Sequence, residues 1–155
     1  MIRNARIKDV KEIHLLLKHF AAQGLLLARS ISSLYDQLRD FIVFEDDDAN
    51  IVGACALHII WEDLAEIRSL AVKEEAQKKG VGRQLVGHCL REAVDLGLDR
   101  VFTLTYQAEF FRKQGFVDID KKELPHKIWG DCIHCTMFPD CDEEALVLTL
   151  PSKAA

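Results

Sequence analysis

The stretch EEAQKKGVGRQLVGHCLREAV, residues 74–94, decides how this chain folds. It places Gly80 and Gly82 directly before a run in which apolar residues recur every three or four positions. One face of that run is apolar and the opposite face is polar, and Gly97 follows as a helix stop. The pattern predicts an amphipathic helix over residues 81–96, between a strand at 66–72 and another at 100–106.

The two glycines suggest a binding site for an anion. A helix N-terminus offers unpaired N–H groups and the positive end of the helix dipole. Glycines let a ligand lie close to the backbone, so a pyrophosphate fits there. The spacing is neither a phosphate loop nor a dinucleotide fingerprint, because Leu85 stands where the latter needs glycine. An ordinary strand-to-helix turn is the alternative interpretation.

The remaining sequence predicts a single α/β (α+β) domain over residues 1–155, with a mixed sheet flanked by helices. We expect a first helix that starts with an Asp9-x-x-Glu12 capping box. A second short helix, capped by Ser32 or Ser33, should run to about Arg39. The other expected elements are strands at 2–7, 41–45, 51–61, 115–119 and 145–150, and a short helix at 108–114.

Composition narrows the class of protein. The 155 residues are 49% apolar and 29% charged, with no apolar run of the roughly 20 residues that a membrane helix needs. The early charges in MIRNARIKDVKEI are unlike a secretory signal, and five cysteines are an odd number for a disulfide framework. A net charge of −5 disfavours nucleic-acid binding. We therefore expect a cytoplasmic protein with no nucleic-acid or membrane partner.

Residues 77–82, QKKGVG, match the Q/R-x-x-G-x-G/A motif of the GNAT acetyltransferase superfamily, and AEFFRKQGF at 108–116 resembles its later motif. The resemblance implies the GNAT fold, a central mixed and mostly antiparallel sheet with helices on both faces, and acetyl-CoA as co-substrate. It also implies a β-bulge in the strand before the motif, whose backbone at Leu70, Ala71 and Val72 pairs with the pantetheine arm. The residues that it assigns to the pyrophosphate are Gln77, Lys78, Lys79, Gly80, Val81, Gly82 and Arg83. Phe111, in the later motif, is also assigned to the cofactor site.

A closer resemblance covers most of the chain. QGLLLARS, WEDLAEIRSLAV, RVFTLTYQAEFFRKQGFVDID and KKELP are similar to the acetyltransferase domain of N-acetylglutamate synthases. This implies transfer of acetyl to the α-amino group of L-glutamate, in arginine biosynthesis, by direct attack of the amine. We expect a short stand-alone form without the amino-acid-kinase domain, and a homodimer is an open option.

The same resemblance assigns the reacting groups. Glu66 matches the family glutamate that removes the ammonium proton, directly or through a water, and a well-placed base of this kind contributes about 10²–10⁴-fold. A strand-end ion pair with a surface Arg or Lys is the alternative for Glu66. A backbone N–H near Leu70 would polarise the thioester oxygen, and Thr105 could hydrogen-bond the cofactor or the amine. Phe111 stands where many members place a tyrosine acid, which leaves Tyr106 or a water to protonate the thiolate.

A dicarboxylate acceptor needs cationic partners. Arg29 matches the arginine of the family G-x-L-x-x-R-S and could grip a carboxylate in bidentate fashion. Arg68, two residues from Glu66, could share its strand face, and Ser69 is assigned to the substrate with them. Solvation of Arg29 and an ion pair between Arg68 and Glu66 are the alternatives.

The segment LPHKIWGDCIHCTMFPDCDEEA, residues 124–145, is rich in cysteine. Cys132, Cys135 and Cys141, with His134 among them and His126 upstream, could hold one structural zinc. A loop with buried cysteines, or a disulfide, is the alternative.

Two other functions remain open from the sequence. One is acetylation of a different amine, such as another amino acid, a polyamine or a protein lysine. The other is a non-catalytic module that binds acetyl-CoA. A carboxylate acceptor would require Arg29, whereas a polyamine would require acidic residues in the pocket.

Overall fold

The computed structural model describes residues 1–124 and 143–151. In chain order the elements are β1 (Ile2–Asn4), η1 (Ile7–Asp9), α1 (Val10–Ala22), α2 (Ile31–Asp36), η2 (Leu38–Asp40), β2 (Phe41–Glu45), β3 (Ile51–Trp61), β4 (Leu64–Val72), η3 (Glu74–Ala76), α3 (Val81–Asp95), β5 (Arg100–Thr105), α4 (Ala108–Lys113), β6 (Val117–Asp118), η4 (Lys121–Glu123) and β7 (Glu144–Thr149), where η marks a 3₁₀ turn.

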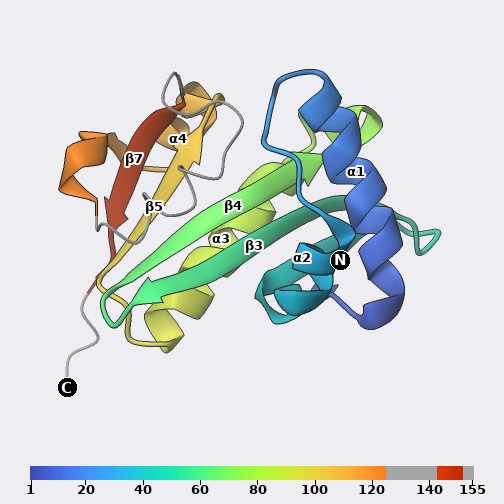
Figure 1. Ribbon diagram of the computed structural model, residues 1–155, viewed down its shortest axis with the longest axis horizontal. Helices are drawn as coiled ribbons and strands as arrows, with labels where there is room; N and C mark the ends of the chain where they lie inside the picture. The colour runs from blue at the N-terminus through green and yellow to red at the C-terminus, as the bar shows by residue number, and fades with distance from the viewer. Residues whose placement is uncertain (125–142, 152–155) are drawn as a thin grey trace.

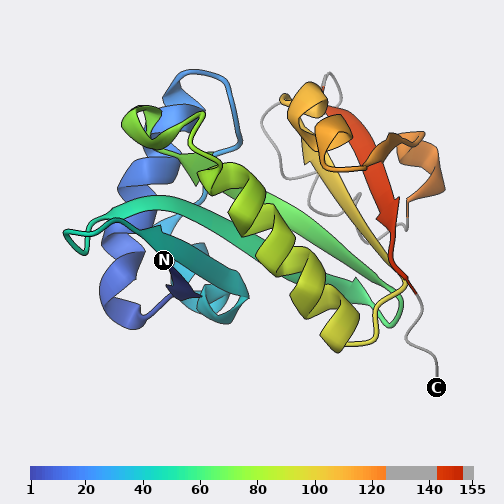
Figure 2. The same cartoon turned by 180° about the vertical axis from the view of Figure 1, so that it is seen from behind.

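The strands form one seven-stranded sheet in the order β1-β2-β3-β4-β5-β7-β6. Every neighbouring pair is antiparallel except β4 and β5, which run parallel. Helices α1 and α2 cover one face of the sheet, and α3 crosses the other (Figures 1 and 2). The expected mixed, mostly antiparallel sheet with helices on both faces is confirmed.

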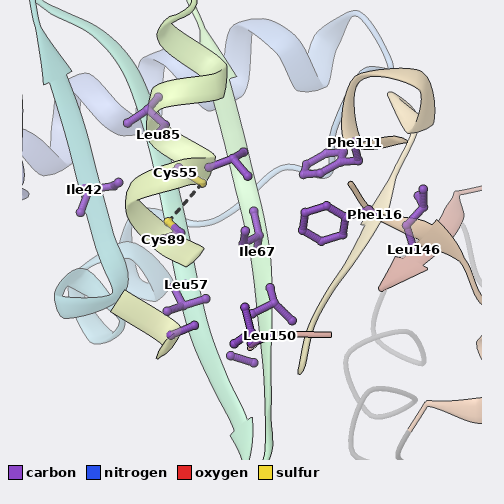
Figure 3. Close-up of a cluster of buried hydrophobic side chains, with 14 of the residues drawn as sticks. Ile42, Cys55, Leu57, Ile67, Leu85, Cys89, Phe111, Phe116, Leu146 and Leu150 are labelled. Carbon is purple, nitrogen blue, oxygen red and sulfur yellow. Dashed lines mark hydrogen bonds between the residues drawn. The ribbon is translucent and has the colours of Figure 1, made fainter. Parts of the chain in front are cut away.

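Alternation along β3 divides the core between the two faces. Cys55 and Leu57 pack toward α3, whereas Ala54 and Ala56 pack toward α1. On the α3 side, Figure 3 shows Leu85 and Cys89 of the helix lying over the strands. This packing fixes the start of α3, and therefore the glycines before it, against the sheet.

The local predictions at the N-terminus were partly wrong. The Asp9 side chain does not cap α1; its carboxylate accepts from the Arg6 backbone N–H at 2.7 Å and from the Arg3 guanidinium at 2.7 Å. The carboxylate oxygens are bonded to Arg3 and to the Arg6 N–H, so they do not accept the hydrogen bond from the first turn of α1 that a capping box requires. β1 ends at Asn4, earlier than the predicted strand at 2–7, and residues Ile7–Asp9 instead form the 3₁₀ turn η1.

The second helix also starts earlier than predicted. Ser30, not Ser32 or Ser33, is the N-cap of α2, and its side-chain oxygen accepts from the Ser33 backbone N–H at 3.0 Å. The helix ends at Asp36, and a separate 3₁₀ turn, η2, continues to Asp40. As a result Gln37 lies at the junction between the two, where it becomes part of the site described below.

Candidate acetyl-transfer site

The strands β4 and β5 separate to form a wedge. They pair only over Leu64–Glu66 and Arg100–Phe102, although β4 continues to Val72. Figure 1 shows the two strands diverging beyond that point. The Thr103 hydroxyl donates to the Ile67 carbonyl at 2.9 Å across the start of the wedge. Among the residues that the structure describes, the divergence leaves the backbone of β4 beyond Glu66 without a neighbouring strand on the β5 side.

A β-bulge interrupts β4 inside this wedge. Arg68 pairs with Ala56 and Ala71 pairs with Ala54, so Ser69 and Leu70 together face one residue of β3. Ser69 has a φ of 57°, in the left-handed region that costs a non-glycine residue about 1–2 kcal/mol. The bulge expected from the family resemblance is therefore present. Glu66 and Arg68 precede it, so the alternation rule holds for them and places both side chains on the α1–α2 face.

A groove of about 520 Å³ runs from the bulge to the start of α3. Its lining includes nine of the residues assigned to the cofactor: Leu70, Ala71, Val72, Gln77, Lys78, Gly80, Val81, Gly82 and Arg83. Lys79 is exposed and does not line it. The sequence analysis did not identify the rest of the lining. It comes from the end of α1, the loop after it, the residue before α4 and α4 itself: Phe20, Leu25, Leu26, Gln107, Phe110 and Lys113.

The loop before α3 contains two residues with left-handed backbone and borders the groove. Gly80 is the N-cap of α3 with a φ of 82°, and Lys78 also has a positive φ, 64°. The Gln77 side-chain amide donates to the Val72 carbonyl at 2.9 Å, which ties the loop to the end of β4. A Cβ on Gly82 would lie 3.3 Å from Phe110 Cζ, so the chain packs closely here. The first N–H groups of α3 and the cations of Lys78 and Arg83 thus border one groove.

The residues that the sequence analysis assigned to the substrate lie on the α1–α2 face of the sheet. Both Arg29 and Arg68 donate from Nη2 to Gln37 Oε1, the Arg68 bond being 2.7 Å long. Arg29 also donates to Ser33 Oγ at 2.9 Å and lies 3.5 Å from Ser69 Oγ. Sequence reasoning missed Gln37, because nothing in its local pattern distinguishes it from a solvated helix-end residue.

Glu66 lies beside this pair of arginines. Its side chain is buried, with 7% of the residue exposed, and Oε1 lies 3.5 Å from Arg68 Nη1. A carboxylate at this depth remains charged most readily when a cation lies nearby. The structure therefore brings together Arg29, Arg68, Ser69 and Glu66, which the sequence had assigned to one site.

The contacts of Thr105 and Phe111 in the structure are with neighbouring protein groups. Thr105 is buried, and its hydroxyl oxygen accepts from the Gln107 backbone N–H at 2.8 Å, at the turn into α4. Phe111 is 3% exposed and packs edge-to-face on Phe116, with ring centroids 5.3 Å apart (Figure 3). Phe110, not Phe111, lines the groove. A contact between Thr105 and the reactants stays a prediction.

The proposed zinc ligands Cys132, His134, Cys135 and Cys141 lie outside the described residues. Among residues 1–124 and 143–151, no group of three His, Cys, Asp or Glu side chains could hold a metal ion. Within the same ranges, no helix has the length and apolar character needed to cross a membrane.

Known proteins with similar sequences and structures include several acetyltransferases. The sequence pattern of the acetyltransferase (GNAT) family matches residues 10–116. An uncharacterised N-acetyltransferase of Chlorobaculum tepidum is 40% identical over 149 residues, which is 96% of each chain. An amino-acid acetyltransferase of Mycobacterium tuberculosis is 39% identical over 133 residues, 84% of this chain and 76% of that protein.

The crystal structure of Neisseria gonorrhoeae N-acetylglutamate synthase with coenzyme A and N-acetyl-glutamate is similar with a TM-score of 0.89 and 31% identity. The match covers 97% of this chain and 35% of that chain, so this protein spans about a third of that synthase. The wedge, the bulge and the glycine loop thus occur together with a match to the family pattern over most of the chain. This chain belongs to the GNAT family of acetyltransferases and is an N-acetyltransferase.

Proposed function

We propose that this protein transfers the acetyl group of acetyl-CoA to the α-amino group of L-glutamate, a reaction of arginine biosynthesis. The observation that carries the proposal is the pair of guanidiniums, Arg29 and Arg68, held through Gln37 beside the buried Glu66. A guanidinium binds a carboxylate through two parallel hydrogen bonds. Two of them next to a candidate base suit an acceptor that carries two carboxylates and one amine.

Acetyl-CoA would occupy the groove. Its pyrophosphate would bind the first N–H groups of α3, with Lys78 and Arg83 supplying positive charge. Its pantetheine arm would follow Leu70–Val72, where β4 has no strand neighbour on the β5 side among the described residues. The bulge at Ser69 and Leu70 would turn a backbone N–H toward the thioester oxygen.

Glu66 would act as the base. The acceptor is an ammonium ion at neutral pH, so its nitrogen must lose a proton before it can form the bond to the thioester carbon. The carboxylate of Glu66 takes that proton, and the neutral amine attacks the thioester carbon to form the C–N bond. As the C–S bond breaks, the second proton that the nitrogen loses passes through a water to the departing thiolate of coenzyme A. Phe111 has no acidic proton and lies in the core, so it does not supply one to the thiolate.

The test is steady-state release of the coenzyme A thiol, with glutamate compared with aspartate, glutamine, ornithine, spermidine and a lysine peptide. We expect saturable turnover with glutamate, its loss in Arg29→Ala and a fall of about 10²-fold or more in Glu66→Gln. Arg39→Ala, an exposed arginine on η2, is the matched control and should keep wild-type kinetics.

Two results would contradict the proposal. Turnover with another amine, but not with glutamate, would mean that the protein is an acetyltransferase with a different acceptor. Binding of acetyl-CoA without turnover on any amine would instead indicate a module that senses the thioester.

A further inference from the structure

Glu66 is a buried base, and a buried base must release its proton in every catalytic cycle. With 7% of the residue exposed, its carboxylate has little direct contact with solvent. The group that takes the proton onward should lie beside Glu66, reach solvent, and exchange protons near neutral pH. His58 lies beside Glu66 and reaches solvent, and imidazole is the side chain whose ordinary chemistry includes proton exchange near neutral pH.

The register of the sheet places His58 next to Glu66. His58 on β3 and Glu66 on β4 are direct partners in the antiparallel ladder. Side chains of such partners lie on the same face, with Cβ atoms about 4.5–5.5 Å apart. The His58 side chain is 29% exposed, so it connects the buried carboxylate with the surface.

Asp40 fixes the orientation of this imidazole. His58 Nδ1 lies 2.6 Å from Asp40 Oδ2, and an ionised carboxylate only accepts hydrogen bonds, so Nδ1–H donates. The proton on Nδ1 leaves Nε2 of the neutral ring as the basic nitrogen. The charged groups near His58 include Asp40 from η2, Glu66 opposite it in the ladder, and Arg68 two residues further along β4.

We propose that His58, oriented by Asp40, is the positioning residue that carries the proton from Glu66 to solvent; this rests on Glu66 being the base of the proposed function. The proton moves from the α-ammonium nitrogen to a carboxylate oxygen of Glu66, then to Nε2 of neutral His58, and then to solvent. Each group returns to its starting protonation state, so the cycle needs no further reactant.

The experiment uses His58→Ala in the full-length protein, with glutamate and acetyl-CoA at saturation. We expect kcat to fall at least tenfold with the KM for glutamate changed less than threefold. Added imidazole should restore turnover in a saturable way, because the open space left by a partly exposed ring is accessible to a small base. Loss of a merely structural contact would not be repaired by a free base.

Two variants separate the proton-carrying role from a structural one. His58→Asn keeps a donor toward Asp40 but carries no proton, so its kcat should fall as far as that of His58→Ala. His14→Ala, a histidine on α1, is the matched control and should keep wild-type kcat and show no response to imidazole. Acetyl-CoA affinity from calorimetry should be unchanged in all three, which verifies that they are folded.

The inference is overturned if His58→Ala keeps kcat within twofold of wild type, if imidazole fails to restore it, or if His58→Asn has wild-type turnover. If one of these results is obtained while glutamate turnover still depends on Glu66, the role of His58 is refuted and the proposed function stands. Absence of glutamate turnover in the wild-type protein would instead remove the proposed function, and the inference with it.

Discussion

The substitution Gln37→Glu should raise the stability of the folded protein and lower its affinity for the substrate glutamate. Gln37 Oε1 accepts hydrogen bonds from Arg29 and Arg68, and Gln37→Glu keeps the size of the side chain while adding a negative charge. The new carboxylate would occupy the guanidiniums that we assign to the substrate. It should therefore strengthen the folded protein and weaken glutamate binding.

The magnitude follows from the geometry of the cluster. A substrate carboxylate on the far side of the same guanidiniums would be separated from the new charge by one guanidinium and two hydrogen bonds, on the order of 6 Å. At an effective dielectric of about 20, the repulsion is about 3 kcal/mol, or about 100-fold in the KM for glutamate. Bonds to both guanidiniums become charge–charge contacts, so thermal unfolding should shift upward by about 2–4 °C per kcal/mol gained.

The assay is steady-state kinetics with glutamate varied and acetyl-CoA saturating, together with a thermal unfolding curve. Gln114→Glu, the same exchange at the end of α4, is the matched control and should leave the KM for glutamate unchanged. A KM within twofold of wild type in Gln37→Glu would refute the reasoning, because it would mean that the substrate does not meet these two arginines.

Three further predictions concern the frame around the site. Gly80→Ala forces an L-residue to a φ of 82° and should cost about 1–2 kcal/mol in urea unfolding, with weaker acetyl-CoA binding in calorimetry. The Cys55 thiol lies 3.8 Å from Cys89 Sγ in a hydrogen bond (Figure 3), and both side chains are fully buried. The hydrogen bond and the burial both raise the pKa of Cys55. Peptide mapping should therefore find neither cysteine alkylated at pH 8 before the protein is unfolded. The Arg3 guanidinium lowers the pKa of the Asp9 carboxyl. The stability it contributes is therefore present above the unfolded-state pKa of about 3.9 and is lost as the pH falls through the lower folded-state value. Denaturant curves should accordingly show Asp9→Asn about 2 kcal/mol less stable at pH 7 and closer to wild type in acid.

The sequence by itself determined those features that depend on near neighbours along the chain. The 3.6-residue period of the run after Gly82 predicted a helix over 81–96, and α3 spans Val81–Asp95. The glycine loop likewise needs only local geometry, since Gly80 supplies the left-handed turn and the helix supplies its own N–H groups. The family resemblance added a bulge in the strand before the loop, which no periodicity reveals, and the structure locates it at Ser69 and Leu70.

Only the tertiary structure decided which side chains meet. Gln37 joins Arg29 to Arg68 because α2 packs on the sheet face that carries Arg68. The pairing of His58 with Asp40 depends on the register of β3 and on a 3₁₀ turn that the sequence did not predict. Phe110 lines the groove in place of Phe111 because tertiary packing turns Phe111 into the core. These contacts join residues far apart in the chain, and their geometry is set by the burial of two apolar faces, which local propensity does not encode.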